Sequence, residues 1–219
     1  MIELLTADTP NGKKVSIMLE EIGFEYKVTK ININPGGEFS KGEQFNPEFR
    51  KISPFSKIPV IIDHENNKEA VFESGAILIY LGEKSNKFYE QKDRTKINQW
   101  LMAQMAYVGP MLGQHHQFHR YNSGKDKWGE ERYFKITKTI YGDLDERLGQ
   151  SNYLAGDNYS IADIATFPWI ARHDWHMPDR IDLRNNYKFL VDWYERVGSR
   201  PAVVKGYDCL NTGEQIPKI

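Results

Sequence analysis

Residues 58–78 read IPVIIDHENNKEAVFESGAIL, and they contain two strand signals followed by one helix signal. The first strand signal, Ile58–Asp63, is a short apolar run that opens with a proline. The polar turn 64–68 separates it from Glu69–Phe72, its expected antiparallel partner. Ser74–Lys84 then has apolar positions suited to a helix that packs on a sheet. This run therefore predicts a ββα unit.

The segment before this unit carries a strand, a helix and a second strand. Ile2–Thr6 favours a strand, and the turn signal Asp8–Gly12 follows it. Apolar residues then recur at helical spacing up to Ile22, and Gly23 stands where a helix-ending glycine belongs. Tyr26–Ile31 alternates like a half-buried strand. The N-terminal residues thus predict a βαβ unit.

Two features connect these units. Asn32–Phe45 is rich in Gly, Asn and Lys, which predicts a surface loop. Asn46–Arg50 has a capping residue followed by proline at the first helical position, which predicts a short helix. The order βαβ, short helix, ββα is the thioredoxin-like layout.

The pattern changes after a polar linker at Ser85–Lys92. Beyond the linker, apolar residues recur at helical spacing in four segments: Trp100–Leu112, Tyr133–Leu148, Ile161–Ile170 and Phe189–Val197. We therefore predict an α/β thioredoxin-like domain over residues 1–84 and an all-helical domain over residues 93–219.

The segment Ser160–Asp163 has the spacing of a capping box. In this motif the serine hydroxyl accepts from a first-turn N–H, and the acidic side chain accepts from the N–H of the cap residue. Such a cap is worth ~1 kcal/mol, so we expect a role in folding rather than in chemistry.

Composition excludes several classes of function. Charged residues make up 27% of the 219 residues and the net charge is −1, without a basic block that would follow a phosphate backbone, so nucleic acid is not an expected partner. Apolar runs such as Ala76–Leu81 fall far short of the ~20 residues that cross a bilayer, and the N-terminus lacks a signal peptide's basic start. We therefore expect a cytoplasmic protein without a membrane partner.

Cys209 is the single cysteine. It cannot form an internal disulfide or a Cys-x-x-Cys redox pair, so any thiol chemistry must use a thiol that a ligand supplies. We interpret Cys209 as an unpaired thiol, either structural or exposed.

The chain resembles the glutathione transferase superfamily, and more closely its nu class, which includes glutathione-dependent disulfide-bond reductases and relatives of a yeast nitrogen regulator. The motifs that carry the resemblance span both predicted domains: Thr9–Gly12, Ile52–Pro54 with Lys57–Pro59, Phe72–Ile77, Gly109–Gln114 and Asn158–Ile164. It implies the glutathione transferase fold, glutathione as co-substrate without a metal, and a homodimer.

The resemblance also implies a reaction centre at Thr9 and Asn11. Other classes of this superfamily place a tyrosine or a serine at the glutathione thiol, whereas the first strand here has Leu5. Thr9 and Asn11 are also ordinary helix-cap residues, and their catalytic interpretation depends on the other motifs.

Glutathione needs an anion site at each end and backbone pairing between them. Glu73 and Ser74 stand where a strand turns into a helix, so Ser74 and the helix N-terminus suit the γ-glutamyl carboxylate, and Glu73 suits the ammonium. In folds that resemble this one the bond before Pro59 is cis, which turns the backbone of Ile58 toward the cysteinyl unit. Lys57 is then placed for the glycine carboxylate. The alternative is a plain strand start with a solvated lysine.

Two further features leave alternatives open. Arg132 resembles an arginine that reaches glutathione across the dimer interface in nu-class proteins, and a solvated arginine on a helix face is the alternative. His115, His116 and His119 lie close together in sequence, but without a glutamate or a remote ligand they favour a polar cleft lining or a hydrogen-bonded core over a metal site.

The favoured function is glutathione-dependent disulfide-bond oxidoreductase, with the thiolate of bound glutathione as nucleophile. One alternative is a glutathione S-transferase or peroxidase that acts on electrophiles or organic hydroperoxides. The other is a non-catalytic regulatory or binding protein on the same fold.

Overall fold

The computed structural model describes residues 1–33 and 41–219, so half of the predicted loop Asn32–Phe45 lies outside the described residues. The chain forms two compact units. The first contains Met1–Lys87 together with Pro201–Gln215, and the second contains Phe88–Arg200 together with Ile216–Ile219.

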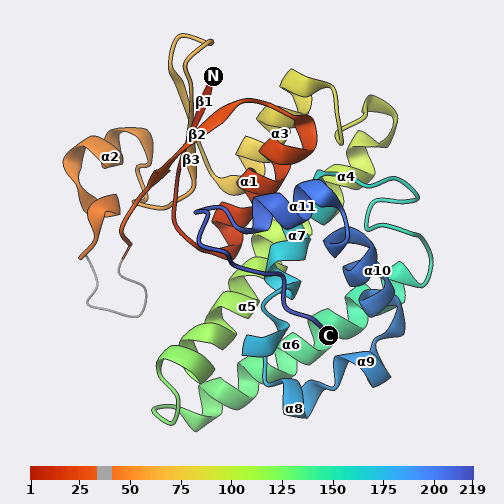
Figure 1. The fold of residues 1–219 in the computed structure, drawn as a ribbon. Coiled ribbons are helices and arrows are strands. Elements are labelled where there is room, and N and C mark those ends of the chain that lie inside the picture. Colours follow the sequence, from red (N-terminus) through yellow and green to blue (C-terminus); the bar gives the residue numbers. More distant parts are fainter. Residues whose placement is uncertain (34–40) are drawn as a thin grey trace. The chain divides into compact units, whose positions relative to one another are not determined.

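The first unit contains a four-stranded mixed sheet in the order β2-β1-β3-β4 (Figure 1). The strands are β1 (Ile2–Thr6), β2 (Tyr26–Lys30), β3 (Val60–Asp63) and β4 (Glu69–Phe72). β1 pairs with β2 in parallel, and β3 is antiparallel to both β1 and β4. This arrangement confirms the predicted thioredoxin-like fold, although β3 begins two residues later than predicted because Ile58 and Pro59 precede the ladder.

Helices α1 (Pro10–Ile22), α2 (Pro47–Ile52), α3 (Ser74–Ser85) and α11 (Pro201–Tyr207) complete the first unit, with a short 3₁₀ turn at Glu43–Phe45. α1 starts with Thr9 as N-cap and Pro10 as first residue, and it ends at Gly23, whose φ of 76° is left-handed. The Gly23 N–H donates to the carbonyl of Leu19. Both helix ends are thus where the sequence predicts them.

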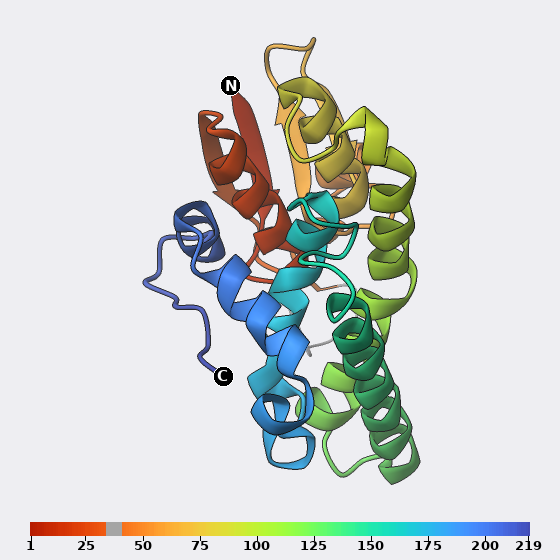
Figure 2. The ribbon, with the colours of Figure 1, turned by 90° about the vertical axis from the view of Figure 1, so that its right-hand side faces the viewer.

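The segment 201–215 packs on α1 through helix α11, and α11 and α1 lie side by side in Figures 1 and 2. A Cβ at Gly206 would lie 2.5 Å from the Ile17 Cα, so only glycine allows this approach. The Nζ of the fully buried Lys13 donates to the carbonyl of Tyr207 at 2.6 Å and lies 2.7 Å from Asp8 Oδ1. It also pairs with Glu214. A division of the chain at one point in the sequence does not reveal that residues 201–215 group with the N-terminal residues.

The second unit is helical and surrounds the largely apolar helix α7, in which all ten residues are buried (Figure 2). Its helices are α4 (Arg94–Ala103), α5 (Gly109–His115), α6 (Lys127–Leu148), α7 (Ile161–Ile170), α8 (Pro178–Ile181), α9 (Leu183–Asn186) and α10 (Lys188–Gly198). Single π-helical turns at Gln104–Val108 and His116–Tyr121, and 3₁₀ turns at Gln91–Asp93 and His173–Trp175, connect them. The four predicted helical segments are confirmed.

The capping box at the start of α7 is also confirmed. The Ser160 Oγ accepts from the Ala162 N–H, and the Asp163 carboxylate accepts from the Ser160 N–H at 3.1 Å. Asp163 also accepts from the Leu154 N–H at 3.0 Å and from the Trp193 indole at 2.9 Å, which ties α7 to α10. Burial raises the pKa of Asp163 to about 6, and these hydrogen bonds oppose the rise.

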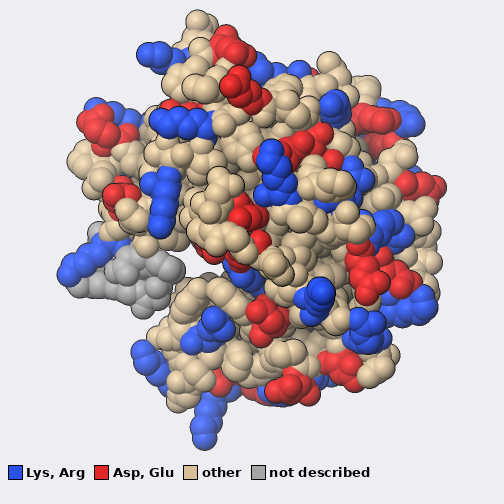
Figure 3. All heavy atoms as spheres, viewed as in Figure 1, with Lys and Arg blue, Asp and Glu red and all other residues tan. Residues whose placement is uncertain are grey.

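Charged side chains of both signs are interspersed on the face seen in Figure 3, as expected for a net charge of −1. Within the described residues, no helix combines the length and the apolar composition that a membrane span requires.

Replacement of Asp163 by Asn should destabilise the protein by about 3 kcal/mol, because the groups around Asp163 are donors and an amide NH₂ would face them. Urea unfolding at neutral pH measures this effect. Asp157→Asn, at an exposed position nearby, is the control and should change the free energy of unfolding by less than about 0.5 kcal/mol. Equal small effects would contradict the structural role of Asp163.

Candidate functional site

The strand register brings the predicted site segments to one end of the sheet. Leu5 near the end of β1 pairs with Val60 at the start of β3, and Val60 pairs with Phe72 at the end of β4. The residues that follow β1, precede β3 and follow β4 therefore lie together. These are the segments that contain Thr9 and Asn11, Lys57–Pro59, and Glu73–Ser74.

The loop after β1 is held close to the strand. A Cβ at Gly12 would lie 2.3 Å from the Thr6 Oγ1 and 2.5 Å from the Ala7 carbonyl oxygen, so this approach requires glycine. The Thr9 Oγ1 accepts from the Gly12 N–H at 3.1 Å, which caps α1. Within the described part of the chain this hydroxyl has no acceptor, so it can still donate to a ligand while it caps the helix. Asn11 is half-buried in the first turn of α1.

The segment before β3 is fixed by a buried serine. The Ser53 Oγ donates to the Lys57 carbonyl at 2.8 Å and accepts from the Lys57 N–H at 3.1 Å. The Lys57 side chain is exposed, and the Ile58–Pro59 peptide bond is cis, as the resemblance implied. This segment therefore presents a cation and an irregular stretch of backbone at the end of the sheet.

The turn from β4 into α3 has an unusual backbone. Glu73 has φ 71° and ψ 117°, a conformation that costs residues with side chains ~1–3 kcal/mol. Its side chain is exposed, whereas Ser74, the first residue of α3, is 3% exposed. The N–H groups of the first turn of α3 and the Ser74 hydroxyl can bind an anion at this point.

The structure places a further residue, Lys14, beside Ser74 at this end of the sheet, and the sequence interpretation missed it. Lys14 of α1 is 1% exposed, and its Nζ lies 3.3 Å from the Ser74 Oγ. Burial lowers the pKa of Lys14 to about 7, and the charge of Glu73 partly opposes this shift. Lys14 is four residues before the buried Met18 and eight before Ile22, so its place on the apolar face of α1 was the signal in the sequence.

Arg132 belongs to the second unit. It is exposed on α6, and its guanidinium lies 5.5 Å from the centre of the Trp128 ring, which is itself 70% exposed. The predicted contact of Arg132 with glutathione remains a prediction.

The histidines form part of the core of the second unit. The His116 Nε2 lies 2.7 Å from the His176 Nε2, and the Tyr141 hydroxyl lies 2.6 Å from the His176 Nδ1. Burial lowers the pKa of His115 to about 4 and that of His116 to about 3. Across residues 1–33 and 41–219, no group of three or more His, Cys, Asp or Glu side chains could hold a metal ion. His116 therefore has a hydrogen-bonded core role, one of the alternatives that the sequence left open.

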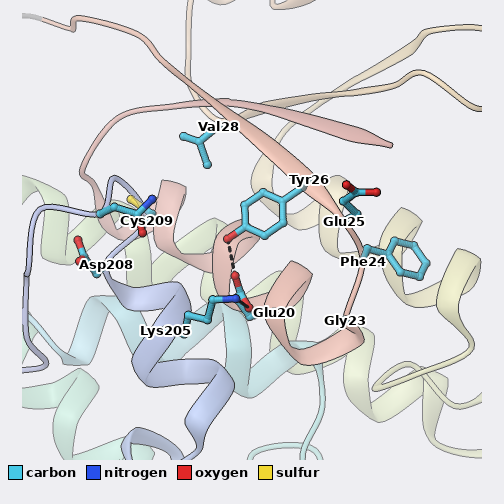
Figure 4. Close-up of a pocket in the computed structure, with 10 residues that line it drawn as sticks. Glu20, Gly23, Phe24, Glu25, Tyr26, Val28, Lys205, Asp208 and Cys209 are labelled. Atoms are coloured by element: carbon cyan, nitrogen blue, oxygen red, sulfur yellow. Dashed lines mark hydrogen bonds and ion pairs between the residues drawn. The ribbon is translucent and has the colours of Figure 1, made fainter.

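A cleft of about 620 Å³ lies at the opposite end of α1, and Figure 4 shows its lining. Glu20 and Gly23 from the end of α1 line it, and none of the predicted site residues does. The Tyr26 hydroxyl donates to the Glu20 carboxylate at 2.8 Å, and Lys205 lies 2.8 Å from the same carboxylate. The Glu20 carboxylate is thus paired with Lys205 and accepts a hydrogen bond from Tyr26.

Cys209 also lines this cleft, but it is 4% exposed and is a free thiol. The alternative of an exposed thiol was therefore wrong, because the side chain is buried in the turn after α11. Burial raises the pKa of Cys209 to about 11, which makes it a poor nucleophile near neutral pH.

Comparison with known proteins places the two parts of the chain in one family. Residues 9–84 match the model of the glutathione S-transferase N-terminal domain, and residues 104–201 match that of the C-terminal domain. Disulfide-bond oxidoreductase YfcG of Escherichia coli (strain K12) is 43% identical over 208 residues, which cover 92% of each chain.

Two crystal structures are similar to the whole chain. A glutathione transferase from Burkholderia graminis, with two glutathione molecules bound per subunit, is 37% identical with a TM-score of 0.87 and covers 97% of this chain and 89% of its own. One from Pseudomonas putida, with one glutathione disulfide bound per subunit, is 37% identical with a TM-score of 0.85 and covers 94% of this chain and 90% of its own.

The low pKa of Lys14 predicts a pH dependence of stability. Between the folded pKa of about 7 and the unfolded value of 10.5, the unfolded chain binds more protons, so stability rises with pH. Wild-type protein should gain up to about 1 kcal/mol per pH unit relative to Lys14→Met from pH 7 to pH 8.5, as measured by urea unfolding. The control is Lys84→Met, which removes a lysine paired with Asp63 at 2.8 Å and should keep the wild-type slope. Parallel curves for wild type and Lys14→Met would refute the shifted pKa.

Proposed function

This chain belongs to the glutathione S-transferase family, and from that premise we propose that it is a glutathione-dependent disulfide-bond oxidoreductase of the nu class. The observation that carries the proposal is the 43% identity to disulfide-bond oxidoreductase YfcG over 92% of both chains. The site agrees with this function because Thr9 and Asn11 are polar groups suited to a thiolate, while the single cysteine is buried elsewhere in the first unit.

The reaction proceeds by two thiol–disulfide exchanges. The thiolate of one glutathione attacks a sulfur of the substrate disulfide, so that a mixed disulfide forms and one substrate thiolate leaves and takes up a proton. The thiolate of a second glutathione then attacks the glutathione sulfur of the mixed disulfide and releases the other substrate thiolate. Two glutathiones and one disulfide thus give one glutathione disulfide and two thiols, without a nucleophile from the protein.

We propose that each segment at this end of the sheet binds one part of glutathione. The γ-glutamyl group lies at Glu73 and Ser74, the cysteinyl backbone runs along Ile58–Pro59, and the glycine carboxylate meets Lys57. The sulfur then arrives at the Thr9–Asn11 loop, where the Thr9 hydroxyl and the Asn11 amide can donate to a thiolate. The common sheet end and the Thr9 cap that leaves a donor available support this assignment.

Positioning matters more than activation of the thiol. A fall in thiol pKa from ~8.5 to ~7 raises the thiolate fraction at neutral pH about 16-fold, but lower nucleophilicity offsets about fivefold of that gain. The net gain is about threefold. Most of the acceleration must therefore come from alignment of the two thiols with the disulfide and from stabilisation of the departing thiolate.

We also propose a cytoplasmic homodimer. The reaction consumes reduced glutathione, which is the thiol buffer of reducing compartments. The exposed Arg132 of α6 is available to a second copy of the chain, whose glutathione it would contact as a binding residue.

Asn11→Ala should lower kcat for reduction of bis(2-hydroxyethyl) disulfide by about tenfold or more, because one donor to the developing thiolate is lost. Its effect on the Kd for glutathione should stay below about threefold, since the binding groups lie elsewhere. Steady-state glutathione oxidation and calorimetry measure the two quantities, with Asn152→Ala at an exposed position as control. Equal losses in turnover and in binding would count against this role.

Cys209→Ser should leave the same activity unchanged within about twofold, because the thiol takes no part in the exchange. A variant that stays folded but loses turnover would show that the protein supplies a thiol. Parallel assays with a chloronitrobenzene and with an organic hydroperoxide test conjugation and peroxidase activity, and faster turnover of either substrate than of the disulfide would overturn the proposed reaction.

A further inference from the structure

The ammonium of Lys13 joins three segments of the first unit. Lys13 is fully buried, and its Nζ lies 2.7 Å from the Asp8 Oδ1 and 2.6 Å from the Tyr207 carbonyl oxygen. The same Nζ also pairs with the Glu214 carboxylate. Because an ammonium has three N–H donors, these three oxygens can use all of them. The hydrogen-bonding capacity and the charge of Lys13 are therefore satisfied by residues that lie before α1, in α11 and after α11.

These contacts lie on both sides of the residues that the proposed reaction uses. Asp8 directly precedes Thr9, and Lys13 directly follows Gly12. The ion pair between Asp8 and Lys13 thus connects the two ends of the segment Thr9–Gly12. Glu214 reaches the same ammonium from 201 residues further along the chain. Movement of the Lys13 ammonium would shift both ends of this segment, and the pairing with Glu214 restricts that movement.

An ordered turn holds Glu214 in this position. The Asp208 carboxylate accepts from the N–H of Thr212 at 2.7 Å and from the N–H of Gly213 at 2.8 Å, which closes a turn directly before Glu214. The Glu214 side chain is 22% exposed, so its contact with the buried lysine is largely shielded from solvent. The segment 208–214 therefore supplies a fixed carboxylate to the start of α1.

We propose that Glu214 is a positioning residue, which acts through Lys13 to hold the Thr9–Asn11 loop where the glutathione sulfur arrives. This inference rests on the proposed function, and it adds to the site a C-terminal segment to which the sequence motifs assign no role. Glu214 reaches the loop only through Lys13. Its loss should therefore impair alignment of the sulfur more than binding of the tripeptide, because Lys57 and Glu73–Ser74, which are proposed to bind the two ends, lie in other segments.

Kinetics of three variants test this role. Glu214→Ala should lower kcat for reduction of bis(2-hydroxyethyl) disulfide by about fivefold or more, because small displacements of aligned groups cost large factors in rate. The Kd for glutathione, measured by calorimetry, should change by less than about twofold. Glu214→Gln keeps an acceptor for Lys13 and should retain more of the turnover. The control Lys205→Ala removes the 2.8 Å ion pair with Glu20 at the other end of α1 and should behave like wild type.

A double-mutant cycle separates positioning from a general loss of stability. In the Asn11→Ala background one of the groups that Glu214 positions is already absent. Glu214→Ala should therefore lower kcat by only about twofold or less in that background, because the two residues act on the same step through the same loop. The same loss of turnover in both backgrounds would show that Glu214 acts independently of the loop and would overturn the inference.

Hydrogen exchange measures the same coupling without any substrate. The backbone amides of residues 7–12 should exchange about threefold or more faster in Glu214→Ala than in wild type, and at the wild-type rate in Lys205→Ala. Unchanged exchange or unchanged kcat in Glu214→Ala would overturn the inference. Wild type that does not reduce the disulfide would overturn the proposed function, and the exchange rates alone would then decide whether Glu214 orders the loop.

Discussion

The antiparallel pairing of β1 with β3, with Leu5 opposite Val60, is the contact on which the site depends. This pairing places the residues after β1 beside those before β3, and the β3–β4 pairing then brings in the start of α3. A register shift of one residue would turn the buried Leu4 and Val60 toward the other face of the sheet, so the register is fixed by burial. The site is therefore positioned by the core of the sheet and not by its own loops.

Helix α1 carries residues that stabilise the fold next to residues of the proposed site. Thr9 caps this helix, Asn11 is in its first turn, and two buried lysines with different surroundings, Lys13 and Lys14, follow. Lys13 stabilises the packing of the C-terminal segment, whereas the Lys14 Nζ lies 3.3 Å from the Ser74 Oγ at the first residue of α3. Burial lowers the pKa of Lys14 to about 7, so the charge of this lysine depends on pH near neutrality.

Local signals made much of the fold predictable. Strand alternation, the Gly23 helix end and the Ser160 capping box each depend on residues within a few positions of one another, and all three appear in the structure. The features that escaped prediction depend on residues distant in sequence. Tyr207 accepts from Lys13 across 194 residues, His176 lies against His116 across 60, and Ser74 contacts Lys14 across 60. Periodicity indicates which face is buried but not what that face contacts, so the contact of Lys14 with Ser74 required the three-dimensional structure.

The central claim is that the protein binds and positions glutathione, whose thiolate is the nucleophile, and supplies no nucleophile of its own. A crystal structure with bound glutathione tests this claim most directly. The account predicts the glutathione sulfur within hydrogen-bond distance of Thr9 and Asn11, and the γ-glutamyl carboxylate at Ser74 and the N-terminus of α3. Glutathione bound elsewhere, or joined to Cys209 as a mixed disulfide, would contradict it.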